Sequence, residues 1–142
     1  MLKIAQQHLD QIARCGEETY PNEGGGLLIG RIDDAGHKVV VEVRSFPNMR
    51  EAEEQYHRIL ITDAMYRDGE AYAEGKGLDL IGFFHSHPDH PARPSEFDRE
   101  HALPWWSYVI VAVNQGQAGD VFSWQLRDDR SRFDEEVMID GQ

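Results

Sequence analysis

The sequence predicts an α/β fold: a curved, mixed β-sheet flanked by helices, with one helix on each side. Near the N-terminus apolar residues recur at helical spacing, whereas later apolar residues alternate or run together between turn residues, as they do in strands. A second helical segment lies between two such groups of strands. The 142 residues suffice for one domain, and no repeat or linker divides them, so we expect a single domain over residues 1–142.

The first half of the chain is predicted to contain a helix, a hairpin and a second helix. A helix from Ala5 to about Tyr20 is indicated by residues at helical spacing: Ile4, His8, Leu9, Ile12 and Cys15. The turn residues 33–36 separate strands at Gly26–Ile32 and Lys38–Phe46, the second with Val39, Val41 and Val43 alternating. Pro47 and Asn48 interrupt the chain before a polar stretch over residues 49–56 and a short strand at 56–61. Thr62 then caps a helix at Asp63–Gly75.

The second half is predicted to be mainly strands. An apolar strand begins near Leu78 and ends at Pro88, which has no N–H for the β-ladder. A proline-containing loop leads to a short helix that starts at Ser95 and runs to about Leu103. Tyr108–Val113 is apolar throughout, which is typical of a central strand covered on both faces. A turn over residues 114–120 precedes strands at 121–127 and 133–139.

Composition restricts the environment and the partners. The formal net charge of −12 disfavours nucleic-acid binding, which draws its affinity from Lys and Arg. No apolar run approaches the roughly 20 residues of a membrane helix. Cys15 is the single cysteine, so no intramolecular disulfide forms, and at helical spacing it is expected to be a core residue. The N-terminal segment turns polar too early for a signal peptide, which favours a cytoplasmic location.

The strand that ends at Pro88 carries a candidate metal site. His85 and His87 are two residues apart, so on a strand their side chains point to the same face. Asp98 follows His87 after ten intervening residues, at the start of the predicted short helix. Two imidazoles and one carboxylate form a donor set typical of catalytic zinc, which keeps its fourth position for water.

Simpler interpretations exist for each part of this pattern. A His-x-His pair at a strand end is commonly exposed polar sequence. Ser95 and Asp98 also fit a capping box, in which a serine and an acid three residues later bind the first N–H groups of a helix. A capping role is compatible with metal binding, because one residue can do both.

Glu23 is the candidate general base. It lies in a turn after Pro21 and directly before Gly24, Gly25 and Gly26, which would let the backbone approach a site closely. The ordinary alternative is a solvated turn glutamate. A carboxylate near a metal can instead take a proton from the attacking water and pass it to a leaving amine.

These residues together resemble the signature of the JAMM (MPN-plus) metalloprotease family. The matching positions are Glu23, His85-Ser86-His87-Pro88 and Ser95-x-x-Asp98, in the same order and spacing, and the resemblance extends from about Ile4 to Ile139. It implies that His85, His87 and Asp98 bind zinc. It also implies that Glu23 deprotonates the water and that Ser95 stabilises the oxyanion.

The resemblance also implies a substrate class. Family members act on C-terminal tails of ubiquitin-like proteins, and those that remove polyubiquitin carry insertions around the core. Only nine residues separate Asp98 from Tyr108, so this chain is similar to the small prokaryotic-type members. Those release the Gly-Gly tail of ubiquitin-like sulfur carriers or modifiers from cysteine, an extension or lysine. Several have cysteine just after the glutamate, where this chain has Gly24, which leaves the subgroup open.

Two other classes of function occur on similar folds. Some family members lack the ligands and act as catalytically silent scaffolds, but here each ligand position is filled. Zinc deaminases have a distantly similar core, yet they require His-x-Glu and Pro-Cys-x-x-Cys, which one cysteine cannot supply. His57, His90 and His101 are expected to be surface residues, and Arg93 a solvated charge or a contact for an acidic tail. Of Trp105 and Trp106, at least one is expected to be buried.

Overall fold

The computed structural model describes residues 1–46 and 61–141. The sheet is formed by strands along the whole described chain: β1 (Leu2–Lys3), β2 (Gly25–Ile32), β3 (Lys38–Ser45), β4 (Asp79–Pro88), β5 (Ser107–Asn114), β6 (Gln117–Leu126), β7 (Phe133–Glu136) and β8 (Met138–Ile139). Three helices accompany them within this part of the chain: α1 (Gln6–Thr19), α3 (Asp63–Gly75) and α4 (Glu96–His101). None of these helices combines the length and apolar composition that crossing a bilayer requires.

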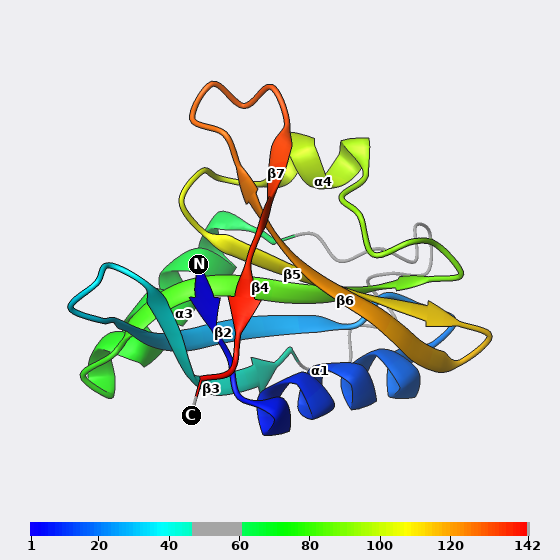
Figure 1. Cartoon of the computed structure of the whole chain (residues 1–142), viewed down its shortest axis with the longest axis horizontal. Coiled ribbons are helices and arrows are strands. Elements are labelled where there is room, and N and C mark those ends of the chain that lie inside the picture. Colours follow the sequence, from blue (N-terminus) through cyan, green and yellow to red (C-terminus); the bar gives the residue numbers. More distant parts are fainter. Residues whose placement is uncertain (47–60, 142) are drawn as a thin grey trace.

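The strands form one mixed sheet in the order β7-β6-β5-β4-β2-β3-β1-β8. β4 pairs antiparallel with β2 on one side and parallel with β5 on the other. β7 and β8 lie at opposite ends of this order, although Val137 alone separates them in the chain. The C-terminal segment therefore passes from one edge of the sheet to the other, and the sheet curls almost closed, as the red segment in Figure 1 shows.

The two faces of the sheet have separate hydrophobic cores. Alternate residues of β5, Val109, Val111 and Val113, pack with Ile12 of α1 on one face. On the other face, Tyr108 of β5 packs with Tyr66 of α3 and with Ala102, which follows α4. The helices thus divide with α1 on one side and α3 and α4 on the other. The N-terminal helix is seen below the sheet in Figure 1.

A buried polar cluster stabilises the curled sheet where its edges meet. Glu136 of β7 accepts hydrogen bonds from Ser107 (2.6 Å) and Ser123 (2.9 Å) through Oε1. Its Oε2 lies 3.8 Å from Nζ of Lys38 and 3.4 Å from the Met1 amino group. Lys38, Ser107, Ser123 and Glu136 are all buried. These contacts join β3, β5, β6 and β7 with the N-terminus through one carboxylate.

The predicted α/β fold is confirmed, and most elements lie where the sequence places them. The helix at Asp63–Gly75 has the predicted bounds, and Thr62 Oγ1 accepts a hydrogen bond from Met65 N. The strand at 107–114 is covered on both faces, as expected. Cys15 is half-buried against the core beneath α1. Trp106 packs on Phe83 and Tyr66, whereas Trp105 is 47% exposed.

Other expectations were wrong at the level of single elements. Val41 is exposed while Val40 is buried, because the pairing of β2 with β3 skips Val41 in a β-bulge that shifts the alternation. The expected turn at 114–120 is only Gln115 and Gly116, both with positive φ, as in a tight hairpin. The polar residues that follow already belong to β6.

Three further differences concern the helices and the edges of the sheet. The helices do not divide one to each side, because α4 joins α3 on one face. The predicted strand at 133–139 is two short strands, and β1 was not expected, since two residues carry no periodic signal. The strand expected at 56–61 and the interruption and polar stretch at 47–56 lie outside the described residues apart from Ile61, which is not in a strand; His57 also lies outside them.

We expect Glu136→Ala to destabilise the protein by about 3–5 kcal/mol, because it leaves the Lys38 ammonium buried without its partner. Glu135→Ala is the matched control, since Glu135 is exposed on the same strand. Urea unfolding measures both free energies. Equal stability of the Glu136→Ala and Glu135→Ala variants would contradict the role of the buried carboxylate.

Candidate metal centre

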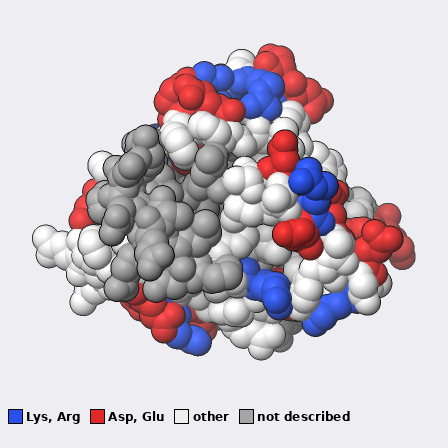
Figure 2. All heavy atoms as spheres, turned by 180° about the vertical axis from the view of Figure 1, so that it is seen from behind, with Lys and Arg blue, Asp and Glu red and all other residues white. Residues whose placement is uncertain are grey.

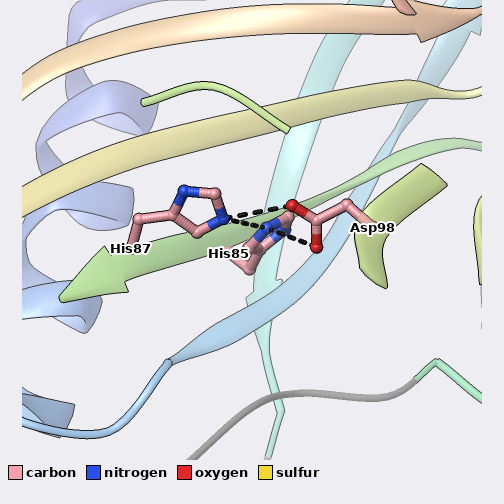
Figure 3. Close-up of side chains that lie close together, drawn as sticks. All are labelled: His85, His87 and Asp98. Carbon is pink, nitrogen blue, oxygen red and sulfur yellow. Dashed lines mark hydrogen bonds and ion pairs between the residues drawn. The ribbon is translucent and has the colours of Figure 1, made fainter. Parts of the chain in front are cut away.

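The structure brings the two predicted histidines and the predicted aspartate together. His85 and His87 lie at the carboxyl end of β4, and Asp98 lies in the first turn of α4. His85 and His87 are opposite Ile110 and Ala112 of β5, so their side chains lie on the face that α3 and α4 cover. Figure 3 shows the two imidazoles and the carboxylate pointing toward one another.

The donor atoms have the spacing that a tetrahedral metal requires. Nε2 of His85 and Nε2 of His87 are 3.1 Å apart. Asp98 places Oδ2 3.1 Å from His87 Nε2 and Oδ1 3.3 Å from His85 Nε2. Zinc bonds of about 2.0–2.1 Å in a tetrahedron separate neighbouring ligand atoms by roughly 3.3 Å. Among the described residues, these three are the group able to hold a metal ion.

The orientation of His87 is fixed by the loop that follows β4. Its Nδ1 lies 2.9 Å from the carbonyl oxygen of Pro91. A carbonyl only accepts hydrogen bonds, so Nδ1 carries a proton and donates it to Pro91, and Nε2 is the ring nitrogen that faces His85 and Asp98. Metal-binding histidines commonly have this arrangement, in which the second ring nitrogen donates to a carbonyl or carboxylate. The sequence alone gives no sign of this partner.

Asp98 is positioned by the capping box that the sequence predicts. Its Oδ2 accepts a hydrogen bond from the backbone N–H of Ser95 (2.8 Å), and Ser95 Oγ accepts one from Asp98 N–H (3.1 Å). The two interpretations of Ser95 and Asp98 are therefore compatible, because the capping carboxylate also contacts the histidines. The Ser95 hydroxyl uses a lone pair for the cap and keeps its proton available to donate.

The electrostatics of the site favour a positive charge between these groups. Burial lowers the pKa of His85, but the charge and hydrogen bond of Asp98 and the charge of Glu23 outweigh it and raise the pKa to about 9. Burial raises the pKa of Asp98, yet the nearby His85 and the hydrogen bonds from His87 and Ser95 hold it far below its usual range. A metal cation between the imidazoles would interact favourably with the same two carboxylates, those of Asp98 and Glu23. The residues present therefore fit a divalent metal.

Glu23 lies near the histidines because of how β2 pairs with β4. Gly25 is opposite His85 in the antiparallel ladder, and Glu23 precedes it by two residues. Ser86 holds the Glu23 segment beside β4. Its side chain points away from the metal-facing histidines. Its Oγ accepts a hydrogen bond from Gly24 N (2.8 Å), and its own N–H donates to Gly24 O (2.9 Å). Gly26 is required at the next position of β2, since a Cβ there would lie 2.2 Å from Arg44 O.

A small cavity of about 30 Å³ adjoins the site, lined by His85, Phe97, Asp98, His101 and Tyr108, among others. This volume holds about one water molecule. His101 is exposed, as expected, although it lines the cavity. His90 is also exposed and is not part of the metal-binding group within the described chain. The half-buried Cys15 has its thiol pKa raised by burial, which does not favour a reactive thiolate.

Comparisons with known proteins define the class and then the family. A solution structure of a Salinibacter ruber protein is 41% identical, with a TM-score of 0.77 over 97% of this chain and 90% of that one. A JAB1/MPN domain protein from Archaeoglobus fulgidus is 20% identical (TM-score 0.60, 96% and 95% covered). A structure described as JAMM, a metalloprotease-like zinc site in the proteasome and signalosome, is 18% identical (TM-score 0.56, 99% of both chains). The fold is therefore that of JAB/MPN proteins.

Within this class, the Prok-JAB family, the prokaryotic homologues of the JAB domain, matches residues 5–127. The chain belongs to this family, which confirms the resemblance found in the sequence. Among curated proteins, no sequence matches the chain.

We expect Ser86→Ala to lower stability by about 1–3 kcal/mol, because the buried N–H of Gly24 loses its acceptor. The metal-binding residues stay in place, so zinc content is expected to be unchanged. Urea unfolding and metal analysis test both points. Ser131→Ala is the control, because that hydroxyl bonds only within an exposed turn. Equal stability of the two variants would show that Ser86 does not secure the Glu23 segment.

Proposed function

We propose that this protein is a zinc-dependent metallopeptidase. Its substrate in this proposal is a ubiquitin-like or sulfur-carrier protein, cut at a peptide or isopeptide bond after the C-terminal Gly-Gly tail. The observation that carries the proposal is the triangle of His85 Nε2, His87 Nε2 and the Asp98 carboxylate, with the charge of Glu23 acting on it. Membership of the Prok-JAB family supports it.

Zinc is the metal that this donor set favours. Two imidazoles and one carboxylate leave one of four tetrahedral positions open, which is typical of catalytic zinc. When bound, zinc would polarise the scissile carbonyl and lower the pKa of a coordinated water toward about 7. A structural neighbour of the same fold is described as a metalloprotease-like zinc site, which supports the choice.

Glu23 is assigned the proton transfers. Glu23 lies two residues before Gly25, which pairs with His85, and its charge contributes to the raised pKa of His85. In this position it would accept a proton from the attacking water and deliver it to the leaving amine. Because Glu23 gives the leaving amine the proton that it takes from the water, its carboxylate is regenerated at the end of each cycle.

Ser95 is assigned to the oxyanion. Its backbone N–H is already committed to Asp98, and its Oγ lone pair to Asp98 N–H. The hydroxyl proton is the group left to donate to the oxygen on which negative charge develops. Removal of one such donor typically costs ~10²–10³ in rate.

The small size of the chain supports the substrate class in this proposal. Only the residues 102–106 separate α4 from β5, so this connection has no room for an insertion of the kind implied for polyubiquitin-cleaving members. A compact site of this kind fits a short, extended tail rather than a second folded domain. We therefore propose ubiquitin-like or sulfur-carrier tails as substrates and the cytoplasm as the location.

Mass spectrometry of a cleavage reaction tests the proposal. The zinc-loaded protein is incubated with a small ubiquitin-like sulfur carrier that is extended beyond its Gly-Gly tail. We expect a single cut after the Gly-Gly that chelator abolishes. Glu23→Ala is expected to keep its zinc but to lose turnover, because the water then lacks its base.

The controls separate this proposal from the alternative that the protein is a catalytically silent scaffold. A Glu23→Ala protein as active as the wild type would remove the role of Glu23. Failure to cut peptide-linked, lysine-linked and cysteine-linked carriers, in a protein that binds no zinc, would favour a catalytically silent scaffold.

A further inference from the structure

A second, larger pocket of about 350 Å³ lies beside the candidate metal centre. It is formed by the loop after β4, the start of α4 and the β6–β7 hairpin, and Ser95 contributes to its wall. Ser95 also holds Asp98 through its backbone N–H, so the pocket adjoins the metal-binding group. The residues that carry the argument are Arg93, Arg99, Trp124, Arg132 and Phe133.

The three arginines of this pocket differ in how far their charges are neutralised. Arg99 pairs with Glu96 and donates to the carbonyl oxygen of Arg130 (2.9 Å). Arg132 lies 3.5 Å from Asp134, and both side chains are more than half exposed. Arg93 is exposed, and within residues 1–46 and 61–141 no hydrogen bond or ion pair is found for its guanidinium. Arg93 is therefore the cation that remains available to a ligand.

The backbone of Arg93 is held in a fixed position relative to the metal centre. Its N–H donates to the carbonyl oxygen of Pro91 (2.8 Å), the same oxygen that orients His87. The preceding residue, Ala92, is buried, and its carbonyl oxygen accepts a hydrogen bond from the indole Nε1 of Trp124 (3.0 Å). A loop restrained at two successive residues presents the arginine with little loss of backbone freedom on binding.

The charge of the pocket contrasts with that of the whole chain. Its lining includes three arginines and one glutamate, whereas the chain carries a formal net charge of −12. Figure 2 shows basic side chains gathered between acidic ones at the top of the molecule, where Figure 1 places α4 and β7. A local positive cleft in an acidic protein concentrates anions at that point and repels them elsewhere. Guanidinium groups match the geometry of carboxylates in particular.

We propose that this pocket binds an acidic side chain of the protein substrate, located within a few residues of the scissile bond, with Arg93 as the main contact. Trp124 and Phe133 would cover the aliphatic part of that side chain. The inference deepens the proposed function and rests on it for the nature of the substrate. Arg93 is a specificity-determining residue in this account and takes no part in bond cleavage.

Peptide binding tests the inference without turnover. The zinc-loaded protein carrying Glu23→Ala is titrated with the capped peptide Ac-Glu-Gly-Gly-Glu-NH₂ and with its matched glutamine analogue. The indole N–H resonance of Trp124 reports on the pocket in nitrogen–proton NMR spectra. We expect the acidic peptide to bind about fivefold more tightly, which is the scale of one exposed ion pair, and to shift this resonance. When Arg93→Gln is combined with Glu23→Ala, the preference for the acidic peptide over its glutamine analogue is expected to disappear.

Arg14→Gln is the matched control, because Arg14 is exposed on α1, which covers the opposite face of the sheet. It removes the same charge and is expected to leave the preference intact. Equal binding of the two peptides, no binding of either, or an equal loss in both arginine variants would overturn the inference. An acid preference in a protein that cleaves no carrier would contradict only the proposed function. Cleavage without an acid preference would contradict only the pocket.

Discussion

The antiparallel pairing of β2 with β4 is the constraint on which the rest of the site depends. It places Gly25 opposite His85 and so fixes the distance between Glu23 and the metal-facing histidines. Two hydrogen bonds between Gly24 and Ser86 secure this pairing at the end of the ladder, on the side of the strand away from the metal. A slip of one residue would turn His85 and His87 to the opposite face and Ser86 toward the metal. The register of β2 on β4 therefore determines which side chains face the metal.

The loop from Pro88 to Asp98 completes the site, because it brings a backbone carbonyl and a carboxylate to the carboxyl end of β4. The Pro91 carbonyl orients His87, and the capping box at Ser95 turns the Asp98 carboxylate toward both imidazoles. Two carboxylates then surround two buried imidazoles, and the resulting field stabilises a cation. The same loop presents Arg93 to the neighbouring pocket, so metal binding and substrate selection would share one rigid segment.

Much of this arrangement is predictable from the sequence, because it depends on local patterns. The His-x-His spacing on a strand, the Ser95–Asp98 capping box and the glycines after Glu23 each have a short-range signature, and the structure brings His85, His87 and Asp98 together. The bulge at Val41, the two-strand C-terminal segment and the buried Glu136 cluster were not predicted. They arise where the sheet curls onto itself, and contacts between residues far apart in the sequence leave no periodic signal. The Pro91 carbonyl was missed for a similar reason, since any residue could supply it.

Zinc analysis combined with X-ray absorption at the zinc edge tests the central claim most directly. The account predicts one zinc per chain, surrounded by four nitrogen or oxygen atoms at about 2.0–2.1 Å, with two imidazoles among them. Replacement of His87 by alanine should remove most of the metal. A zinc–sulfur distance of about 2.3 Å would place the metal at Cys15 instead. Absence of zinc from the wild-type protein, or retention of it after loss of His87, would equally contradict the assignment of this site.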